Sequence, residues 1–420
     1  MKKLIVLIFL LFLTSCGRQE VEYVDTEQTV DETIEGAHGS GLKEMLAIDD
    51  MKWVASYQAK GEHTKLVDID AEVELPELNE MKAIKGRYYT VDDVSYRADF
   101  LKRFAGDDGE IYLSPISDEQ VKDIFKEWGD ASDIQGQEYI YNTEYTSLSL
   151  TAISTSIDKL IKADDFKSLR YVVKKGEYYY NVTFGGTWQF GVGIDLINKN
   201  ALFGAELEVE FFPDDGVVLN GDPLKKCSDK GEEFLKTLGV SESYRVNDGA
   251  NLIFQMSQED VEKHGLPNQI NGGFSVWYRD TFDGCDIGNG SSCSISMKDD
   301  ILIRFTMEKP RDAGEYVTDN TKVLAFNDFK NSVEEELKSF DVAFYSEDNE
   351  LLESMEALHI NKVSLVYGEV SDDSKEYAII PVWYLSGKAE GKAVGDSWGI
   401  SFNAVDGKMI DDQAAYFFDE

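Results

Sequence analysis

The chain is poor in the residues that most often build metal and catalytic centres. Its 420 residues include four histidines and four cysteines. No two histidines stand at the spacing of zinc ligands, and neither a G-x-S-x-G elbow nor a phosphate-binding P-loop occurs. The sequence therefore nominates no catalytic residue, and we expect no cofactor apart from the calcium considered below.

Positive charge is also scarce. The chain has 41 lysines and arginines against 80 aspartates and glutamates, a formal net charge of -39 at pH 7. Such a surface repels phosphate backbones, which argues against nucleic acid as a partner. The hydrophobic fraction of 42% nevertheless suffices for real cores, so the composition excludes disorder throughout and favours folded domains with an acidic, solvated exterior.

Long apolar runs are absent beyond the first sixteen residues. Lys2 and Lys3 precede an unbroken apolar run at positions 4–13, the layout of a secretory signal that is too short to span a bilayer. The run ends in Leu-Thr-Ser-Cys, which resembles the lipobox of bacterial lipoproteins. The resemblance implies that Cys16 carries a diacylglyceryl group after cleavage of the signal. We therefore expect attachment to the outer face of the cell membrane through Cys16.

Residues 17–43 follow as an acidic segment without amphipathic period that closes in Gly-Ser-Gly. We expect a flexible tether between the lipid anchor and the folded part. Turn residues cluster again at positions 214–223. From the restarts of the pattern we predict an N-terminal α+β domain at 44–223, a middle α+β module at 224–322 and a C-terminal module at 323–420.

Helices and strands alternate in blocks along the chain. The clearest strand runs from Val67 to Leu75, where apolar residues alternate with four carboxylates. We therefore expect one face of the strand to be buried in the core and the other to face solvent. A helix is predicted to end at Gly239, and another covers 327–340 with an apolar stripe. Antiparallel strands follow each helix. This pattern indicates the α+β class, as a tandem of helices packed on antiparallel meanders.

The C-terminal run EYAIIPVWYLSG…DSWGISFNAVDGKMI resembles the PepSY-like and YycH/YycI-like modules found outside Gram-positive cells. A strand with Pro381 and Trp383 precedes a strand that ends in the Asn403–Gly407 hairpin. More loosely, the whole chain resembles an uncharacterised family of clostridial-type lipoproteins. The resemblance implies cystatin-like packing of one helix on a meandering sheet, and a non-enzymatic regulatory or ligand-holding role.

Within this module we expect a contact surface for a protein partner in the cell envelope. Its distinctive residues set shape and include no nucleophile or base; they are Pro381, Trp383, Trp398, Asp406 and Gly407. Proline cannot donate to a ladder on both sides, so we expect Pro381 at a sheet edge or a bulge. The alternative is that both tryptophans fill the core.

The segment 280–293 supports two interpretations. Cys285 and Cys293 would close a hairpin tip with a disulfide, leaving Cys227 as a buried free thiol. Alternatively, Asp280, Asp283 and Asp286 would bind calcium, although the register of a calcium loop and its closing glutamate are missing. The disulfide is the favoured interpretation.

These features lead us to expect a membrane-anchored extracytoplasmic lipoprotein with a non-enzymatic binding or regulatory role. Two alternatives stay open. One is an envelope hydrolase that acts on glycan or peptide, for which two facing carboxylates in a cleft would be the signature. The other is the substrate-capturing lipoprotein of a transporter, although the alternating βα pattern of a two-lobed binder is missing.

Overall fold

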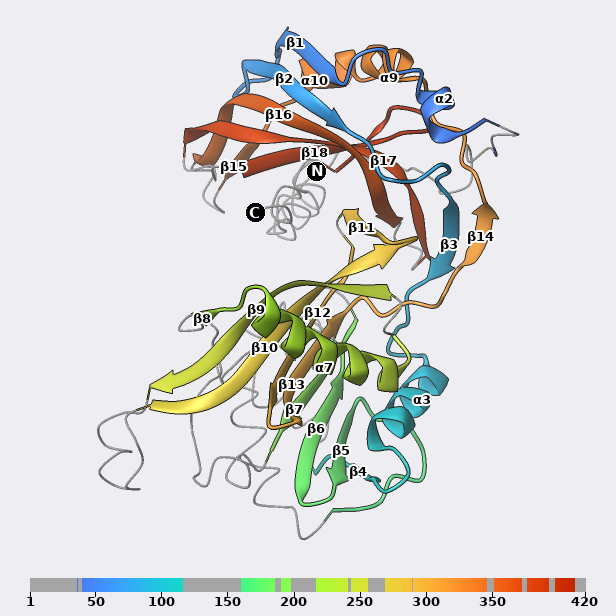
Figure 1. Ribbon diagram of the computed structural model, residues 1–420, viewed down its shortest axis with the longest axis vertical. Helices are drawn as coiled ribbons and strands as arrows, with labels where there is room; N and C mark the ends of the chain where they lie inside the picture. The colour runs from blue at the N-terminus through green and yellow to red at the C-terminus, as the bar shows by residue number, and fades with distance from the viewer. Residues whose placement is uncertain are drawn as a thin grey trace, which may run out of the picture. The chain divides into compact units, whose positions relative to one another are not determined.

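The computed structural model describes residues 36, 40–115, 160–185, 190–197, 217–240, 243–255, 269–288, 290–345, 351–371, 376–392 and 397–411. The predicted signal with Cys16 and most of the predicted tether lie outside the described residues. Within those ranges we find no helix with the length and apolarity that crossing a bilayer requires. The fold is mixed α+β, with extensive sheet and few helices in the described part (Figure 1).

The chain divides into two compact units. Unit 1 combines Met1–Lys85 with Glu315–Glu420, and unit 2 is the intervening segment Gly86–Gly314. In Figure 1 the blue segments and the elements from β14 to β19 belong to unit 1, and the elements from α3 to β13 belong to unit 2. The grouping joins residues 44–85 to the C-terminal residues, which the ranges predicted from sequence kept apart.

Unit 1 contains one large sheet. Its elements are α2 (Leu42–Leu46), β1 (Lys52–Gln58), β2 (Leu66–Glu74), β3 (Ala83–Arg87), β14 (Glu315–Thr318), α9 (Phe326–Ser332), α10 (Glu334–Ser339), β15 (Ala343–Tyr345), β16 (Leu351–Ser371), β17 (Glu376–Lys392), β18 (Ser397–Asn403) and β19 (Met409–Asp411). Among these strands the pairing order is β1-β2-β16-β17-β18-β19, with β15 also on β16, and with β3 pairing both β17 and β14. The β2–β16 pair is parallel, and it brings together segments about 290 residues apart in the sequence.

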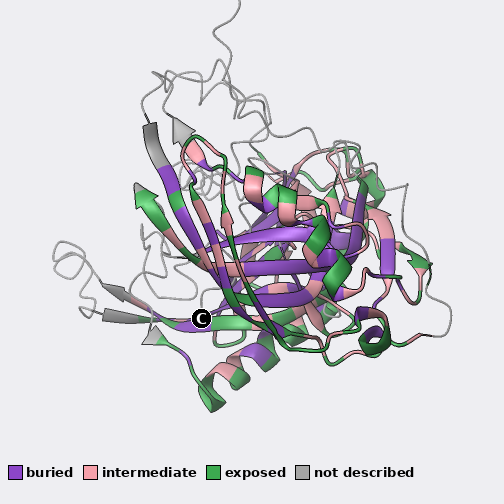
Figure 2. Cartoon of the chain, turned by 90° about the horizontal axis from the view of Figure 1, so that it is seen from above, coloured by how far each residue is buried: buried purple, intermediate pink, exposed green. Residues whose placement is uncertain are grey.

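The consecutive helices α9 and α10 contribute buried apolar side chains to the core of unit 1. The apolar stripe predicted for residues 327–340 is present, because Phe329, Val333, Leu337 and Phe340 are all buried. The helix is interrupted at Val333, which lies between α9 and α10. The Phe326 and Phe329 rings lie 5.0 and 5.3 Å from the Trp383 ring of β17. The central strands are therefore buried under the helices along much of their length (Figure 2).

Unit 2 is a second helix-on-sheet unit. Its elements are α3 (Val94–Ala105), β4 (Glu110–Leu113), β5 (Arg170–Lys175), β6 (Tyr178–Phe184), β7 (Gly191–Leu196), β8 (Val217–Val218), α7 (Asp222–Leu238), β9 (Tyr244–Gln255), β10 (Gln269–Phe282), β11 (Cys285–Gly288), β12 (Ser292–Lys298) and β13 (Ile301–Glu308). The described strands pair antiparallel in the order β4-β5-β6-β7-β13-β12-β10-β9-β8, and β11 extends the hairpin arm on β10.

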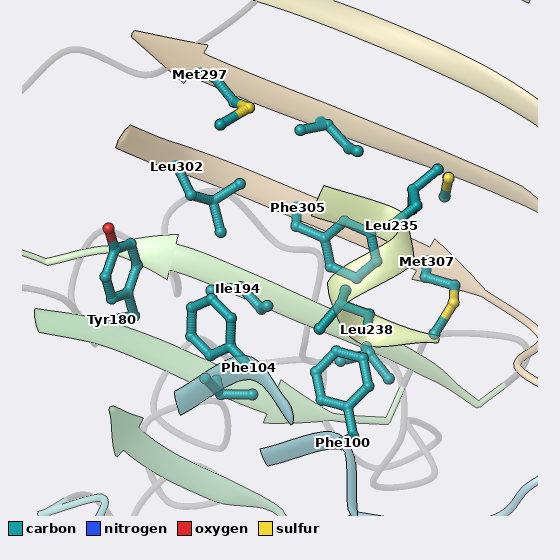
Figure 3. Close-up of a cluster of buried hydrophobic side chains, with 14 of the residues drawn as sticks. Phe100, Phe104, Tyr180, Ile194, Leu235, Leu238, Met297, Leu302, Phe305 and Met307 are labelled. Atoms are coloured by element: carbon teal, nitrogen blue, oxygen red, sulfur yellow. The ribbon is translucent and has the colours of Figure 1, made fainter. Parts of the chain in front are cut away.

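Apolar side chains from two helices pack into the core of unit 2. Phe100 and Phe104 of α3 and Leu235 and Leu238 of α7 meet the apolar side of the strands around Phe305 (Figure 3). The predicted stop of α7 is confirmed, because Gly239 follows the helix in the left-handed conformation that glycine adopts without strain. Helix α7 begins at Asp222, with Pro223 in its first turn.

Candidate functional site

A line of acidic side chains lies on the exposed face of β2. Val67, Ile69, Ala71 and Val73 are at most 4% exposed, whereas the alternating residues Asp68, Asp70, Glu72 and Glu74 lie on the other face of the strand. The predicted alternation of apolar and acidic residues is therefore confirmed. Because side chains on a strand alternate with a period of two, all four carboxylates share one line on the solvent side.

Three basic side chains on the neighbouring strands lie close to the carboxylates of β2. Lys52 Nζ of β1 lies 2.6 Å from Asp70 Oδ1, and Lys362 Nζ of β16 lies 3.0 Å from Glu74 Oε2. The His359 ring of β16 lies between two carboxylates: its Nδ1 is 3.9 Å from Asp68 Oδ2, and its Nε2 is 3.5 Å from Glu390 Oε1. We define the charged face as this set of side chains: Lys52, Asp68, Asp70, Glu72, Glu74, His359, Lys362 and Glu390.

The charged face holds an excess of acid. Five carboxylates face two lysines and one histidine, and the side chains in these ion pairs are 38% to 70% exposed. Such exposed pairs contribute little to stability, typically about 0–1 kcal/mol each. Hydrogen bonding to Asp70 raises the pKa of Lys52, so this lysine stays charged. The face is thus suited to electrostatic recognition of a positively charged surface more than to holding the fold together.

Strand β1 forms one edge of the sheet beside the charged face. Within the described residues its pairing partner is β2 alone, in a register without shifts from Lys52 to Gln58. Trp53 is buried against the Phe326 and Phe329 rings at 6.0 and 6.1 Å, whereas Val54 is 69% exposed. One face of β1 is therefore fixed to the core while the other reaches solvent.

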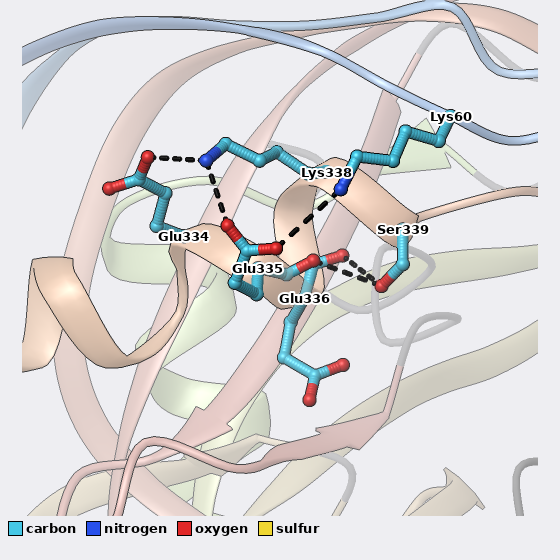
Figure 4. A network of polar contacts seen from close by, with 6 residues as sticks. All are labelled: Lys60, Glu334, Glu335, Glu336, Lys338 and Ser339. Atoms are coloured by element: carbon cyan, nitrogen blue, oxygen red, sulfur yellow. Dashed lines mark hydrogen bonds and ion pairs between the residues drawn. The ribbon is translucent and has the colours of Figure 1, made fainter.

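A second acidic group lies on α10, which contacts β1. Lys338 Nζ lies 2.6 Å from Glu334 Oε1 and 2.8 Å from Glu335 Oε1, and Lys60 Nζ lies 3.6 Å from Glu335 Oε2 (Figure 4). Hydrogen bonds to Glu334 and Glu335 raise the pKa of Lys338. Together with the charged face, this cluster puts carboxylates on both sides of the β1 edge.

The segment between β1 and β2 is fixed by one carboxylate group, that of the exposed residue Asp341. Asp341, just after α10, accepts the backbone N–H groups of Glu62, His63 and Thr64 at 2.9, 2.9 and 2.7 Å. Burial alone would raise the pKa of Asp341, but the three N–H donors hold it below its ordinary value. Gly61 is required beside this contact, since a Cβ there would overlap the Asp341 carboxylate. Sequence reasoning missed Asp341, because a single aspartate after a helix carries no recognisable signal.

The two tryptophans nominated for partner contact are core residues. Trp383 and Trp398 are 0% and 3% exposed. Pro381 is also buried, in a strand with neighbours on both edges. The structure corrects the expected sheet edge at Pro381: the β17–β18 ladder ends at Val382, so the missing N–H of Pro381 falls where the neighbouring strand stops.

The nominated turn at Asp406 and Gly407 faces inward. Gly407 is buried, has φ of 80°, and packs so closely on Ser332 of α9 that a Cβ would overlap it. Asp406 Oδ1 accepts the N–H of Lys408 at 3.0 Å, which closes the turn. The five nominated residues therefore do not form a common exposed surface in this structure.

The segment 280–293 of unit 2 contains two arginine–carboxylate pairs. Arg311 Nη2 lies 2.7 Å from Asp280 Oδ2, with the two side chains 11% and 1% exposed, and Arg245 Nη2 lies 2.6 Å from Asp286 Oδ2. Ser291 Oγ also donates to Asp280 at 3.1 Å. Asp283 occupies a positive-φ turn position before Gly284. In the described residues no three acidic, histidine or cysteine side chains converge as a metal site would require.

The cysteines of this segment are free thiols in the structure, as is Cys227. Cys285 pairs with Phe282 and Cys293 with Tyr278, so the two stand four positions apart along β10. That separation corresponds to about 13 Å along a strand, whereas the Cα atoms of a disulfide lie within about 7 Å. The register thus keeps the two thiols apart. Burial raises the pKa of the Cys293 thiol well above its usual value.

Comparisons with known proteins give distant similarities. No protein family model matches the chain, and no curated protein matches its sequence. Among solved structures, the chain is similar to an uncharacterized protein from Eubacterium rectale, with 9% identity and a TM-score of 0.35 over 89% of this chain and 96% of that one. It is also similar to the YpeB C-terminal domain of Bacillus megaterium, with 13% identity and a TM-score of 0.24 over 78% and 97% of the two chains.

Proposed function

We propose that the chain is a lipid-anchored extracytoplasmic protein with a non-enzymatic binding or regulatory role. The anchor is Cys16, supported by the basic pair, the apolar run and the Leu-Thr-Ser-Cys end of the first sixteen residues. Two acyl chains on one residue suffice for stable attachment to a membrane. The folded part would then work at the outer face of the cell membrane.

One observation carries the binding role. The four carboxylates of β2 are spread in a line along its exposed side, and Asp280 of unit 2 is closed inside a pair with Arg311. A hydrolase needs a carboxylate pair, or a nucleophile with its base, converging on one reacting atom. A line of carboxylates instead offers a surface that attracts a cationic partner at long range. The charged face is therefore the surface that we assign to binding.

The module architecture is part of this proposal. We infer two helix-on-meander modules of the PepSY-like kind, one formed by α7 with β9, β10, β12 and β13, the other by α9 and α10 with β15 to β19. In support, α7 contacts β9 and β10, and the aromatic side chains of α9 pack on Trp383 of β17. Such modules present sheet faces and edges, which suits a protein that works by contact.

The anchor is tested by fractionation of cells that express Cys16→Ala. We expect the variant to leave the membrane fraction or to accumulate as uncleaved precursor. Cys227→Ala, a cysteine removed elsewhere in the chain, is the matched control and should fractionate like the parent. Unchanged membrane association of fully processed Cys16→Ala protein would contradict the anchor.

The binding role is tested by photo-crosslinking in intact cells. A photoreactive amino acid replaces Glu72 on the charged face or, as a control, the exposed Glu233 on α7 of unit 2. We expect a discrete crosslinked partner from position 72 and not from position 233. The same products from both positions, or none from either, would count against a partner on the charged face.

A further inference from the structure

The outer edge of β1 is long and lacks the usual protection of an edge strand. Three other strands of unit 1 with a single described neighbour, β14, β15 and β19, have only four, three and three residues, and short edges resist strand addition. Strand β1 has seven residues without proline, glycine or bulge. Its one charged residue, Lys52, is bound to Asp70 of the neighbouring strand. The edge from Trp53 to Gln58 therefore has no charge to repel an incoming strand.

The register identifies which backbone groups face outward. Val73 N donates to Met51 O at 2.9 Å, so Met51 and Val73 form a hydrogen-bonded pair of the β1–β2 ladder. In an antiparallel ladder such pairs alternate with pairs whose N–H and C=O groups point away. Trp53, Ala55 and Tyr57 therefore direct their backbone groups to β2, while Val54 and Ser56 direct theirs to the open edge.

Carboxylates near the β1 edge favour an incoming strand that carries positive charge. Asp70 and Glu72 stand on the solvent side of the neighbouring strand, and Asp50 precedes β1; the charges of all three act on Lys52. On the helix side, burial raises the pKa of Tyr57, and the negative charge of Glu334 raises it by more than the positive charge of Lys338 lowers it. Carboxylates thus flank the edge on both faces, and lysine or arginine side chains of an added strand would meet opposite charge on either side.

We propose that the β1 edge binds an extended, cationic segment of a partner protein by strand addition, with backbone hydrogen bonds to Val54 and Ser56. This inference rests on the proposed binding role and names the class of its partner. A second copy of the chain is disfavoured as the occupant, because it would bring the same acidic surroundings against themselves in a chain of net charge -39. Main-chain hydrogen bonds would supply affinity, and the flanking carboxylates would supply selectivity for basic side chains.

The test uses the full-length chain in detergent and a fluorescent peptide of alternating lysine and valine. Ser56→Pro removes an outward N–H without touching the β1–β2 ladder, and Ser56→Ala keeps that N–H as the matched control. We expect Ser56→Pro to weaken binding of the peptide at least tenfold and Ser56→Ala to change it less than twofold. Glu72→Gln should weaken binding several-fold at low salt and less at high salt. An alternating glutamate and valine peptide should not bind.

Equal binding of the lysine–valine peptide to the proline and alanine variants would overturn the inference, as would equal binding of the acidic peptide. A concentration-dependent dimer that Ser56→Pro abolishes would replace the cationic partner with a second copy. The crosslinking experiment separates the two proposals. If position 72 still captures a partner while the peptide fails, strand addition is refuted and the binding role stands; if both fail, the binding role fails too.

Discussion

Unit 2 buries an acidic side chain and neutralises it with arginine, whereas unit 1 leaves the acidic side chains of β2 on the solvent side. The Arg311 and Asp280 side chains are 11% and 1% exposed, while those of the Lys52–Asp70 and Lys362–Glu74 pairs are 47% to 66% exposed. The same residue type therefore serves two purposes. In unit 2 the ion pair holds a hairpin segment in place, and in unit 1 the carboxylates form a surface. Burial, not composition, separates the structural carboxylates from the candidate binding ones.

The units also differ in how the chain builds them. Unit 2 is one continuous segment with antiparallel pairs throughout its described strands, whereas unit 1 joins the two ends of the sequence through the parallel pair β2–β16 and the Asp341 contact. Closing so long a loop carries an entropic cost that grows slowly with its length. We therefore expect contacts that join the two segments of unit 1 to matter more for its stability than its surface ion pairs.

The largest effect is expected from Arg311→Met in unit 2. The change leaves the Asp280 carboxylate buried without its arginine, and breaking a buried pair on one side costs about 3–5 kcal/mol. Urea unfolding, followed by a probe of unit 2 such as Trp277 fluorescence, measures the loss. Arg245→Met, which removes the more exposed pair with Asp286, should cost only about 1 kcal/mol. A loss below 1 kcal/mol for Arg311→Met would mean that water reaches Asp280 easily.

A smaller effect is expected from Asp341→Ala in unit 1, which leaves three backbone N–H groups without their carboxylate acceptor. Loss of such hydrogen bonds costs roughly 1–3 kcal/mol. Because the folded-state pKa of Asp341 is lowered, its contribution is complete above the unfolded-state pKa and disappears as the pH falls through the folded-state pKa. Unfolding free energies of parent and variant should thus differ at pH 7 and converge below about pH 4. A difference that does not depend on pH would contradict an ionised Asp341.

Much of the local structure was predictable from the sequence. The alternation in β2, the apolar stripe of α9 and α10, and the end of α7 at Gly239 all follow from periodicity and capping, which act over a few residues. Periodicity states which face of a strand is buried but not which strand lies beside it. The sequence therefore did not predict that β2 pairs in parallel with β16, nor which segments of the chain form unit 1.

The candidate site was less predictable for the same reason. Tryptophans are large and apolar enough to fill either a core or a contact surface, and sequence alone does not distinguish the two at Trp383. Arg311 lies 31 positions beyond Asp280 and has no motif that marks the pair. Among the described residues β1 pairs with β2 alone, and no residue within β1 encodes which strands lie beside it.

A still smaller effect is expected from Lys338→Met on α10. The variant removes the base from the cluster with Glu334 and Glu335, but this cluster is open to solvent. Exposed pairs are worth about 0–1 kcal/mol and weaken with salt. The unfolding free energy should change little, with the difference shrinking at high salt. A loss as large as that of Asp341→Ala would break the distinction between joining contacts and surface pairs.

The smallest effect, close to none, is expected from reductant. A disulfide between Cys285 and Cys293 would close a short loop worth roughly 2–3 kcal/mol in the chain-entropy model, so its reduction would lower the unfolding midpoint of unit 2. Because the β10 register holds these thiols about 13 Å apart, we expect the midpoint to be the same with and without reductant.

Thiol counting on unreduced, denatured, lipid-modified protein should find Cys227, Cys285 and Cys293. In the folded protein Cys293 should react most slowly, because its thiol is buried and its pKa is raised. A count of one thiol would instead support the predicted Cys285–Cys293 disulfide, which would require a shift of the β10–β12 register.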